Sequence, residues 1–245
     1  WIDPSQPSRV YVGSDGGFFR SSNGGTVWTK SLGLPISQFY AGAIHPQNPE
    51  TLLGGTQDNG TLATSGAPTL WSALGIGGDG FQCLVHPTNA SIVFAEYQYC
   101  CYGTGPQRST TGGVSFSGAT RFIASDRYNW NAPIVMNPLN PNVVMSASHR
   151  VYRSTNNGIN YSIISPNLTT DPVASVVFGT ISTLDISPAD TSVYYAGTDD
   201  GKVWRSIDRG SSWTDISAGL PKLWVTRVTA SPTNPNVVYV THSGF

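Results

Sequence analysis

The chain has 245 residues, of which 39% are hydrophobic and only 11% are charged, and its net charge is −1. Nucleic acids and anionic membranes both need concentrated positive charge on a partner, so this balance argues against binding to either. No run of about 20 apolar residues occurs, and we therefore expect no membrane span. The 27 Gly and 17 Pro, together with many aromatic residues, are typical of an all-β protein with many turns.

A turn motif recurs along the chain, with a Ser followed at fixed distances by Asn or Asp, Gly and an aromatic residue. The copies read SSNGGTVW (21–28), TSGAPTLW (64–71, a decayed copy), STTGGVSF (109–116), STNNGINY (154–161) and SIDRGSSW (206–213). A second motif places prolines at positions 4, 46, 87, 138, 188 and 232. Two interleaved motifs with one period of about 45 residues predict a β-propeller, in which each repeat is a four-stranded antiparallel blade.

The clearest repeat predicts strands at 183–187, 193–197, 203–206 and 213–216, separated by turns at Pro188, at 199–201 and at the Ser-x-Asp-x-Gly motif. On this pattern the chain holds about five and a half blades. It starts inside a first strand and stops after a second one, so its ends duplicate a strand instead of completing a blade. We therefore expect a single propeller domain over residues 1–245 that is an excerpt of a larger protein with further blades or domains.

The Ser-x-Asp-x-Gly-x-x-Trp turn resembles the Asp-box of bacterial-neuraminidase-type (BNR) repeats. The stretches GGTQDNGT (54–61), GGDGF (77–81) and GTDDGKVWRSIDRGSSW (197–213) resemble sortilin-like and xyloglucanase-type members of that superfamily. The resemblance covers the whole chain and implies a propeller. It does not select a function, because such propellers include sialidases, other glycosidases, lectins and protein receptors.

We expect the box residues to be structural. The Ser hydroxyl and the Asn or Asp side chain can bind backbone N–H groups of the turn, the Gly allows positive φ, and the aromatic ring packs between blades. This role is predicted for Ser21, Asn23, Gly25, Trp28, Ser109, Gly113, Phe116, Ser154, Asn156, Gly158, Tyr161, Ser206, Asp208, Gly210 and Trp213.

One face of the predicted propeller, formed by the B–C and D–A connections, collects acidic and aromatic side chains. The candidates for a ligand-binding face are Asp58, Asp199, Asp200, Tyr128, Trp130 and Trp224, and Glu96 is expected on the same face. Carboxylates accept hydrogen bonds from sugar hydroxyls, and flat rings cover pyranose faces. The alternative is ordinary turn chemistry, since Asp-Gly hairpin turns need no ligand.

A catalytic hypothesis rests on Asp15. The stretch VGSDGGFFRSS (12–22) resembles the segment that carries one catalytic Asp in xyloglucanase-type inverting hydrolases. Inversion needs a second carboxyl group about 6.5–9.5 Å away, and Asp79 is the nearest candidate by position, although no motif supports it. A sialidase is disfavoured because its Arg-Ile-Pro signature is missing. We expect no cofactor and no metal, since the four His residues come from separate blades.

The three cysteines do not form a disulfide framework. The expected strand register sets Cys83 opposite about residue 95, which leaves Cys100 too far away for a bridge. We expect Cys100 and Cys101 to be free, half-buried thiols at the end of a strand.

Three functions remain open. The first is a non-catalytic propeller, secreted or at the cell surface, that binds a glycan or an extracellular protein. The second is a xyloglucanase-type inverting glycoside hydrolase. The third is a structural repeat module in an extracellular assembly. All three share an expected extracellular location.

Overall fold

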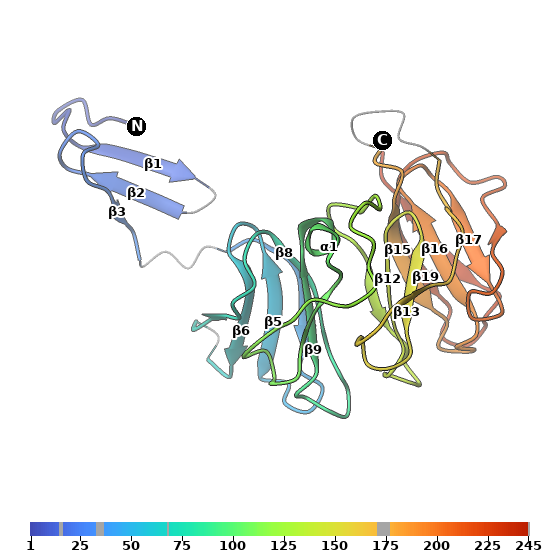
Figure 1. Ribbon diagram of the computed structural model, residues 1–245. Helices are drawn as coiled ribbons and strands as arrows, with labels where there is room; N and C mark the ends of the chain where they lie inside the picture. Colours follow the sequence, from blue (N-terminus) through green and yellow to red (C-terminus); the bar gives the residue numbers. More distant parts are fainter. Residues whose placement is uncertain (15–16, 33–36, 68, 171–176, 245) are drawn as a thin grey trace.

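The computed structural model consists of small antiparallel sheets that follow one another along the chain, and each sheet is one blade (Figure 1). It describes residues 1–14, 17–32, 37–67, 69–170 and 177–244. Blade 1 contains β1 (Val10–Ser14), β2 (Gly17–Ser21) and β3 (Thr29–Lys30); blade 2 contains β4 (Phe39–Ile44), β5 (Thr51–Thr56), β6 (Gly60–Ser65) and β7 (Ser72–Ala73); blade 3 contains β8 (Gly80–Val85), β9 (Val93–Tyr97) and β10 (Gln107–Ser109). Blade 4 contains β11 (Ile134–Met136), β12 (Val144–Ala147), β13 (Val151–Ser154) and β14 (Ser162–Ile163); blade 5 contains β15 (Ile181–Ile186), β16 (Tyr194–Thr198), β17 (Val203–Ser206) and β18 (Thr214–Asp215); blade 6 contains β19 (Val225–Ala230) and β20 (Val238–His242).

The predicted all-β fold with four-stranded antiparallel blades is confirmed in blades 2, 4 and 5. In blade 3 a bridge between Arg108 and Ser117 takes the place of the fourth strand. A bridge between Ile2 and Val10 precedes β1, where the sequence predicts the end of a first strand. In blade 5 the third strand has its predicted bounds, whereas β15 begins two residues earlier than expected.

Blades 2 to 6 pack face to face in chain order, which explains why their strands carry apolar residues on both sides, whereas blade 1 stands apart from them (Figure 1). The first strands of neighbouring blades lie side by side: β4 beside β8, β8 beside β11, β11 beside β15, and β15 beside β19. In β9, the buried Val93 and Ala95 pack with Leu53 of blade 2. The alternate residue Phe94 packs on Tyr152 of blade 4. Successive side chains of one strand therefore stabilise two different interfaces.

The backbones of blades 2 and 3 approach each other unusually closely. A Cβ atom added at Gly55 would lie 2.1 Å from the carbonyl oxygen of Phe81. One added at Gly80 would lie 2.3 Å from the carbonyl oxygen of Gly60. Such distances exclude any side chain at these positions, so glycine is required here by the contact between the two sheets.

The Asp-box turns have the hydrogen bonds that the sequence predicts. In blade 4 the Ser154 hydroxyl accepts a bond from the N–H of Gly158 at 2.9 Å and donates to Asn156 Oδ1 at 2.9 Å. Asn156 Oδ1 also accepts the N–H of Asn160. The turns that begin at Ser21, Ser109 and Ser206 repeat the bond from the box Gly to the Ser hydroxyl, at Gly25, Gly113 and Gly210.

The box aromatic residues differ in burial from blade to blade. Tyr161 is fully buried in the cluster that joins blades 3 and 4. Phe116 packs against the cluster that joins blades 2 and 3, and Trp213 Nε1 donates to the carbonyl of Ile164 in the preceding blade at 2.9 Å. Trp28 in blade 1 is 41% exposed.

A short helix, α1 (Gln98–Gly103), follows β9 where the sequence predicts the end of a strand. Four of its residues, from Tyr99 to Tyr102, have φ between 49° and 59°, so the turn is left-handed. The described residues contain no helix that is long and apolar enough to span a membrane. α1 changes the surroundings of Cys100 and Cys101, as described below.

Candidate functional site

Asp79 connects three elements at the rim of blades 2 and 3, through its carboxylate and its backbone N–H. Asp79 directly precedes β8, and its Oδ1 accepts the N–H of Asp58, in the turn between β5 and β6, at 2.8 Å. Its Oδ2 lies 3.5 Å from the donating hydroxyl of Tyr40 in β4. The N–H of Asp79 donates to Gln98 Oε1 in α1 at 2.9 Å, and Gln98 Nε2 donates to the Tyr102 hydroxyl at 3.1 Å. One hydrogen-bonded series therefore joins Tyr40 to Tyr102.

Aromatic rings surround this series. Tyr40 is 39% exposed, Trp130 37% and Tyr102 61%. The buried ring of Phe81 lies beneath two of them, with its centroid 4.7 Å from that of Tyr40 and 6.1 Å from that of Trp130. Tyr99 contacts Trp130 edge-on at 5.0 Å. We call the group Tyr40, Asp79, Gln98, Tyr102 and Trp130 the α1 surface.

A cavity of about 540 Å³ adjoins the α1 surface. One wall is the connection from β7 to β8, around Gly77 and Gly78, and another is formed by Tyr97, Gln98 and Tyr102. Its size lies in the usual range for small-ligand sites, about 300–1,000 Å³. The cavity offers backbone groups, side-chain amides and phenol hydroxyls beside exposed rings.

The left-handed turn of α1 positions the polar side chains of the α1 surface. Residues with a Cβ atom disfavour this conformation by about 1–2 kcal/mol each. Hydrogen bonds from Tyr99 N–H to the Trp130 carbonyl and from Thr104 to the Cys101 carbonyl hold the turn in place. No sequence pattern indicates this turn, because left-handed runs of ordinary residues have no recognisable signature. Strained backbone of this kind is more frequent at functional sites.

Beneath α1 lies a buried group of thiols and one carboxyl group, and here three expectations need correction. Cys100 and Cys101 belong to α1, and they are fully buried instead of half-buried. Glu96, expected on the exposed face, is also fully buried. The prediction that Cys100 and Cys101 are free is confirmed, and Cys83 is free as well. The error arose because the packing of the next blade, and not the local pattern, decides which rim residues are covered.

The ionisation of these groups follows from their burial. Desolvation raises the pKa of Cys83 and of Cys101 to about 12 and raises that of Cys100 as well. Desolvation also raises the pKa of Glu96 well above its ordinary value, and the nearby N–H of Gln82 opposes this only in part. Neither carboxyl oxygen of Glu96 has a hydrogen-bond partner of normal geometry among the described residues. Burial thus favours the protonated form of the Glu96 carboxyl group and of the three thiols.

Three of the predicted ligand-binding residues have other partners. Asp199 is only 1% exposed, and its carboxylate accepts bonds from Phe178 N–H and from the N–H and hydroxyl of Thr180. Asp200 Oδ2 accepts two bonds from Thr170. Tyr128 is 6% exposed, and its hydroxyl donates to the Ile123 carbonyl at 2.8 Å. Asp199 and Tyr128 are therefore buried residues with structural partners, contrary to the expected binding role, and Asp200 is held by the connection between β14 and β15.

The remaining predicted site residues are distributed as follows. Trp130 belongs to the α1 surface, and Asp58 is exposed at its edge. Trp224 is half-buried in another part of the rim, where its ring meets Phe178 edge-on at 6.2 Å. Asp15 lies outside the described residues, so its distance to Asp79 is undefined here. Among the described residues, no three His, Cys, Asp or Glu side chains converge as metal ligands.

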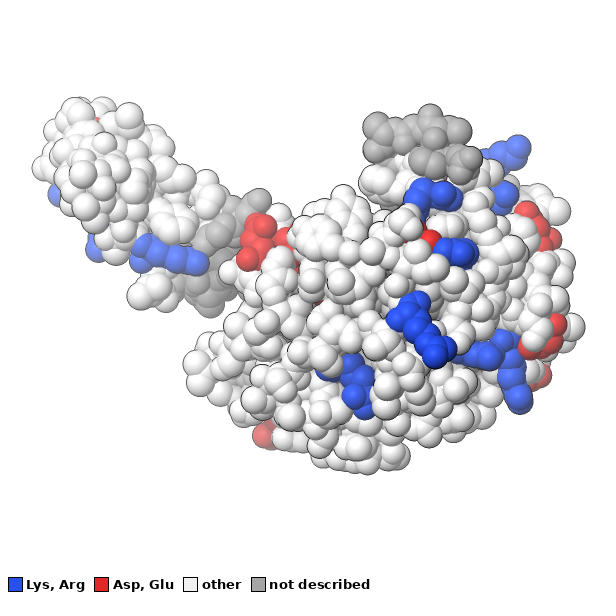
Figure 2. Space-filling view, viewed as in Figure 1, with Lys and Arg blue, Asp and Glu red and all other residues white. Residues whose placement is uncertain are grey.

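Charged side chains are sparse on the surface. Figure 2 shows Lys and Arg as separate small areas on a mostly uncharged face, next to a few acidic ones. The residues that form the α1 surface and line its cavity include one acidic side chain, Asp79, and no Lys or Arg. The site therefore suits a neutral polar ligand better than an anion.

Comparison with known proteins supports the fold. No protein-family model matches the sequence, and no curated protein matches it either. Among solved structures, an ancestral GH74 enzyme matches with a TM-score of 0.64 and 22% identity, over 95% of this chain and 33% of that enzyme. The GH74 xyloglucanase from Xanthomonas campestris matches with a TM-score of 0.63 and 13% identity, over 99% of this chain and 43% of the enzyme.

A third match is YCF48 from Cyanidioschyzon merolae, with a TM-score of 0.51 and 12% identity, over 98% of this chain and 90% of that protein. The predicted resemblance to xyloglucanase-type and BNR-type propellers is therefore confirmed at the level of the fold. The chain spans less than half the length of the two GH74 enzymes. Because this fold occurs in hydrolases and in other proteins, it leaves the function open.

Proposed function

We propose that this propeller binds a neutral glycan at the α1 surface, as a secreted or cell-surface module. The observation that carries the proposal is the juxtaposition of three exposed aromatic rings with a carboxylate and an amide, beside a cavity of about 540 Å³. Sugars need both components, since their hydroxyl groups form hydrogen bonds while their C–H faces cover aromatic rings.

The polar groups of the site are already oriented without a ligand. Asp79 is fixed by the N–H of Asp58, and Gln98 is fixed between Asp79 and Tyr102. Side chains that are ordered in advance lose less conformational entropy when a ligand binds. The absence of Lys and Arg from the described lining favours neutral sugars over sulfated or uronic acid chains, which need cationic partners.

The test is a calorimetric titration of the protein with xyloglucan oligosaccharides, with cello-oligosaccharides and with heparin. We expect saturable binding of a neutral oligosaccharide and none of heparin. Trp130→Ala and Gln98→Ala should each weaken binding about tenfold, which corresponds to about 1.4 kcal/mol. Tyr239→Ala, at a 63% exposed ring in β20, is the matched control and should bind like the wild type. Binding that survives both variants at the α1 surface would contradict the proposal.

A second candidate, hydrolysis of a β-glucan, is favoured by the shared fold with the GH74 enzymes and by the partly exposed carboxyl of Asp79. In that case Asp79 and Asp15 would serve as the acid and the base of an inverting reaction. Release of reducing ends from xyloglucan, abolished by Asp79→Asn and by Asp15→Asn, would favour catalysis. Glycan binding without any release of reducing ends would favour the binding function.

A further inference from the structure

An arginine link joins blade 3 to blade 4 and blade 4 to blade 5, on the side of the Asp-box turns. Arg20, Arg108, Arg153 and Arg205 each stand directly before the box Ser of their blade. Arg108 Nε donates to the carbonyl of Asn157 at 2.6 Å, and Arg153 Nη1 donates to the carbonyl of Arg209. Asn157 and Arg209 occupy the same position in their turns, three residues after the box Ser. The carbonyl at this position is thus the receptor for the arginine of the preceding blade.

Blade 2 breaks this rule, because Ala63 occupies the position of the arginine. The carbonyl equivalent to those of Asn157 and Arg209 in blade 3 belongs to Gly112. The equivalence is shown by a backbone bond that all three residues make to the A–B turn of their own blade: Gly112 to Ser91, Asn157 to Asn142, and Arg209 to Ser192. Since Ala63 has no donor, the chain itself cannot supply the arginine link between blades 2 and 3.

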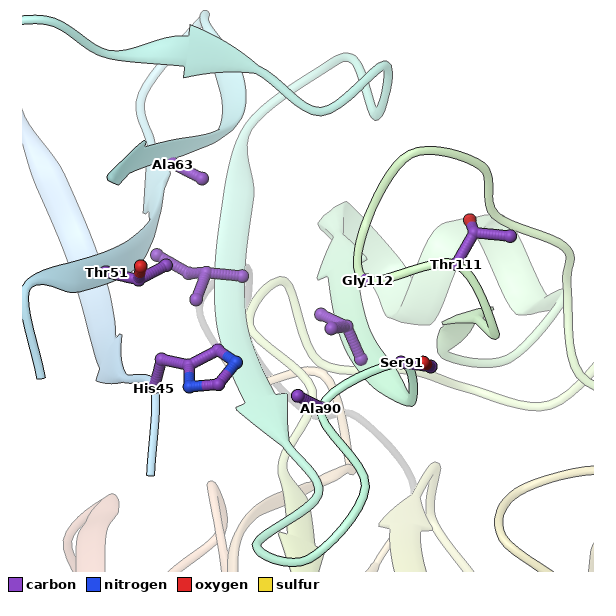
Figure 3. Close-up of a pocket in the computed structure, with 9 residues that line it drawn as sticks. His45, Thr51, Ala63, Ala90, Ser91, Thr111 and Gly112 are labelled. Atoms are coloured by element: carbon purple, nitrogen blue, oxygen red, sulfur yellow. The ribbon is translucent and has the colours of Figure 1, made fainter. Parts of the chain in front are cut away.

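A groove of about 340 Å³ occupies this place between the two blades, and Figure 3 shows its lining. Ala63 and Thr51 come from blade 2, while Ala90, Ser91 and Gly112 come from blade 3. The His45 ring points across the groove toward Ala90 (Figure 3). Its Nδ1 accepts the N–H groups of Gln47 and Asn48, which fixes the ring. We call this space the Ala63 groove.

The chemistry of the Ala63 groove matches an arginine side chain. Leu53, Ala63 and Val93 provide apolar walls for a methylene chain. The Gly112 turn and the hydroxyl of Ser91 provide hydrogen-bond acceptors, and the fixed imidazole provides a flat surface on which a guanidinium can stack. The lining contains no Lys or Arg that would repel a cation.

We propose that the Ala63 groove binds the arginine side chain of a peptide partner, in the manner in which blades 4 and 5 bind Arg108 and Arg153. The partner presents an exposed arginine whose guanidinium donates to the Gly112 carbonyl. Lysine is a poorer ligand, because the links within the chain use Nε and Nη donors of a planar group that an ammonium lacks. This site is distinct from the α1 surface and does not depend on the proposed glycan function.

The experiment uses the full chain and two pentapeptides, acetyl-GGRGG-amide and acetyl-GGKGG-amide, titrated by NMR. We expect saturable shifts of the backbone signals of Ser91, Thr111 and Gly112 with the Arg peptide, and at least tenfold weaker binding of the Lys peptide. Ala63→Arg should fill the groove from within and reduce binding of the Arg peptide by at least tenfold. Ala63→Met fills the same space without a guanidinium and should also weaken binding of the Arg peptide by at least tenfold. This second variant keeps the test valid if Ala63→Arg does not fold.

A gain of binding provides the complementary test. Arg153→Ala, combined with Ala63→Met, should open an equivalent groove between blades 4 and 5 and restore binding, now with shifts at Arg209. Tyr239→Ala serves as a surface control and should bind like the wild type. Equal binding of both peptides, no saturable binding by the wild type, or unchanged binding after Ala63→Met would each overturn the proposal.

Discussion

At the scale of single residues, the box Ser shows how one hydroxyl determines a turn. The Ser154 side chain is fully buried, and it joins the N–H of Gly158 to Asn156. Ser206 makes the same bonds to Gly210 and Asp208. Asp208 also accepts bonds from Ser212, and these hydrogen bonds lower its pKa to about 2. The box residues thus have a complete structural explanation.

Replacement of Ser154 by Ala should therefore cost stability. The N–H of Gly158 would lose its acceptor inside a buried turn, which costs about 1–3 kcal/mol. Urea denaturation followed by fluorescence measures the change in the free energy of unfolding. Ser162→Ala, at an exposed position in β14, is the control and should change it by less than about 0.5 kcal/mol. Equal effects of the two substitutions would contradict the role of the box hydroxyl.

Glu96 is the residue whose charge state most directly links pH to stability. The corresponding positions in blades 2, 4 and 5 are Gly55, Ala147 and Gly197, so a long side chain occurs only here among these four blades. The Glu96 side chain is fully buried at this position. In the folded state the carboxyl group keeps its proton above its ordinary pKa.

The sign of the pH effect follows from proton binding. The unfolded chain releases the Glu96 proton near pH 4.3, whereas the folded chain retains it, so stability falls as the pH rises above about 4.3. The slope from this one group approaches about 1.4 kcal/mol per pH unit until the folded state also ionises. Glu96→Gln should remove this slope, and the stability difference between variant and wild type should grow from pH 5 to pH 7. A constant difference over that range would show that Glu96 is ionised in the folded state.

At the scale of elements, α1 is held in its left-handed turn by a tight contact at its end. Gly103 has φ +77°, and a Cβ atom there would lie 2.9 Å from the Cα of Ala124. Gly103→Ala should therefore destabilise the protein by more than about 1 kcal/mol and weaken glycan binding, because Gln98 and Tyr102 lose their support. Gly118→Ala is the matched control, since its added Cβ atom meets its nearest neighbour at 3.4 Å. Denaturation of the two variants measures the loss of stability, and calorimetric titration measures the loss of glycan binding.

The reactivity of the thiols shows whether α1 covers them. Cys83, Cys100 and Cys101 are buried, and their raised pKa values keep them protonated at neutral pH. Since the thiolate is the reactive form, Ellman's reagent should react with all three in denaturant and far more slowly in buffer. Gly103→Ala should speed the reaction of Cys100 and Cys101. Rapid reaction of the native wild type would show that the thiols are accessible.

At the scale of the whole molecule, blades 2 and 3 depend on glycines where their backbones meet. Gly55→Ala would place a Cβ atom 2.1 Å from the Phe81 carbonyl, which forces the two sheets apart. We expect a loss of more than about 2 kcal/mol, at the upper end of single substitutions. Gly42→Ala in the same sheet, with its nearest neighbour at 3.5 Å, should have a much smaller effect. Thermal unfolding of both variants is the measurement, and similar midpoints would contradict the close contact.

The sequence predicted the features that recur from blade to blade, but not the features that occur in one blade only, such as α1. Box turns and strand registers follow from local chemistry, and the pairing of Cys83 with Ala95 has the expected register. The burial of Glu96, Tyr128 and Asp199 depends on residues that are distant in the sequence, such as Phe178 and Thr180 for Asp199, and no local pattern encodes such contacts. α1 was missed for the related reason that its turn is stabilised by distant contacts. The sequence placed Trp130 and Asp79 on one rim, and the structure brings both into the α1 surface, whereas the polar partners of Asp79 were not predicted.

The arginine links have a direction, since each runs from one blade to its successor in the chain. Blade 4 therefore carries a donor for the blade after it and an acceptor for the blade before it. Duplication of blade 4 would remake the link at both new junctions, whereas insertion of a fraction of this repeat would leave an arginine without its receptor carbonyl. One complete repeat is therefore the smallest insertion that preserves these links.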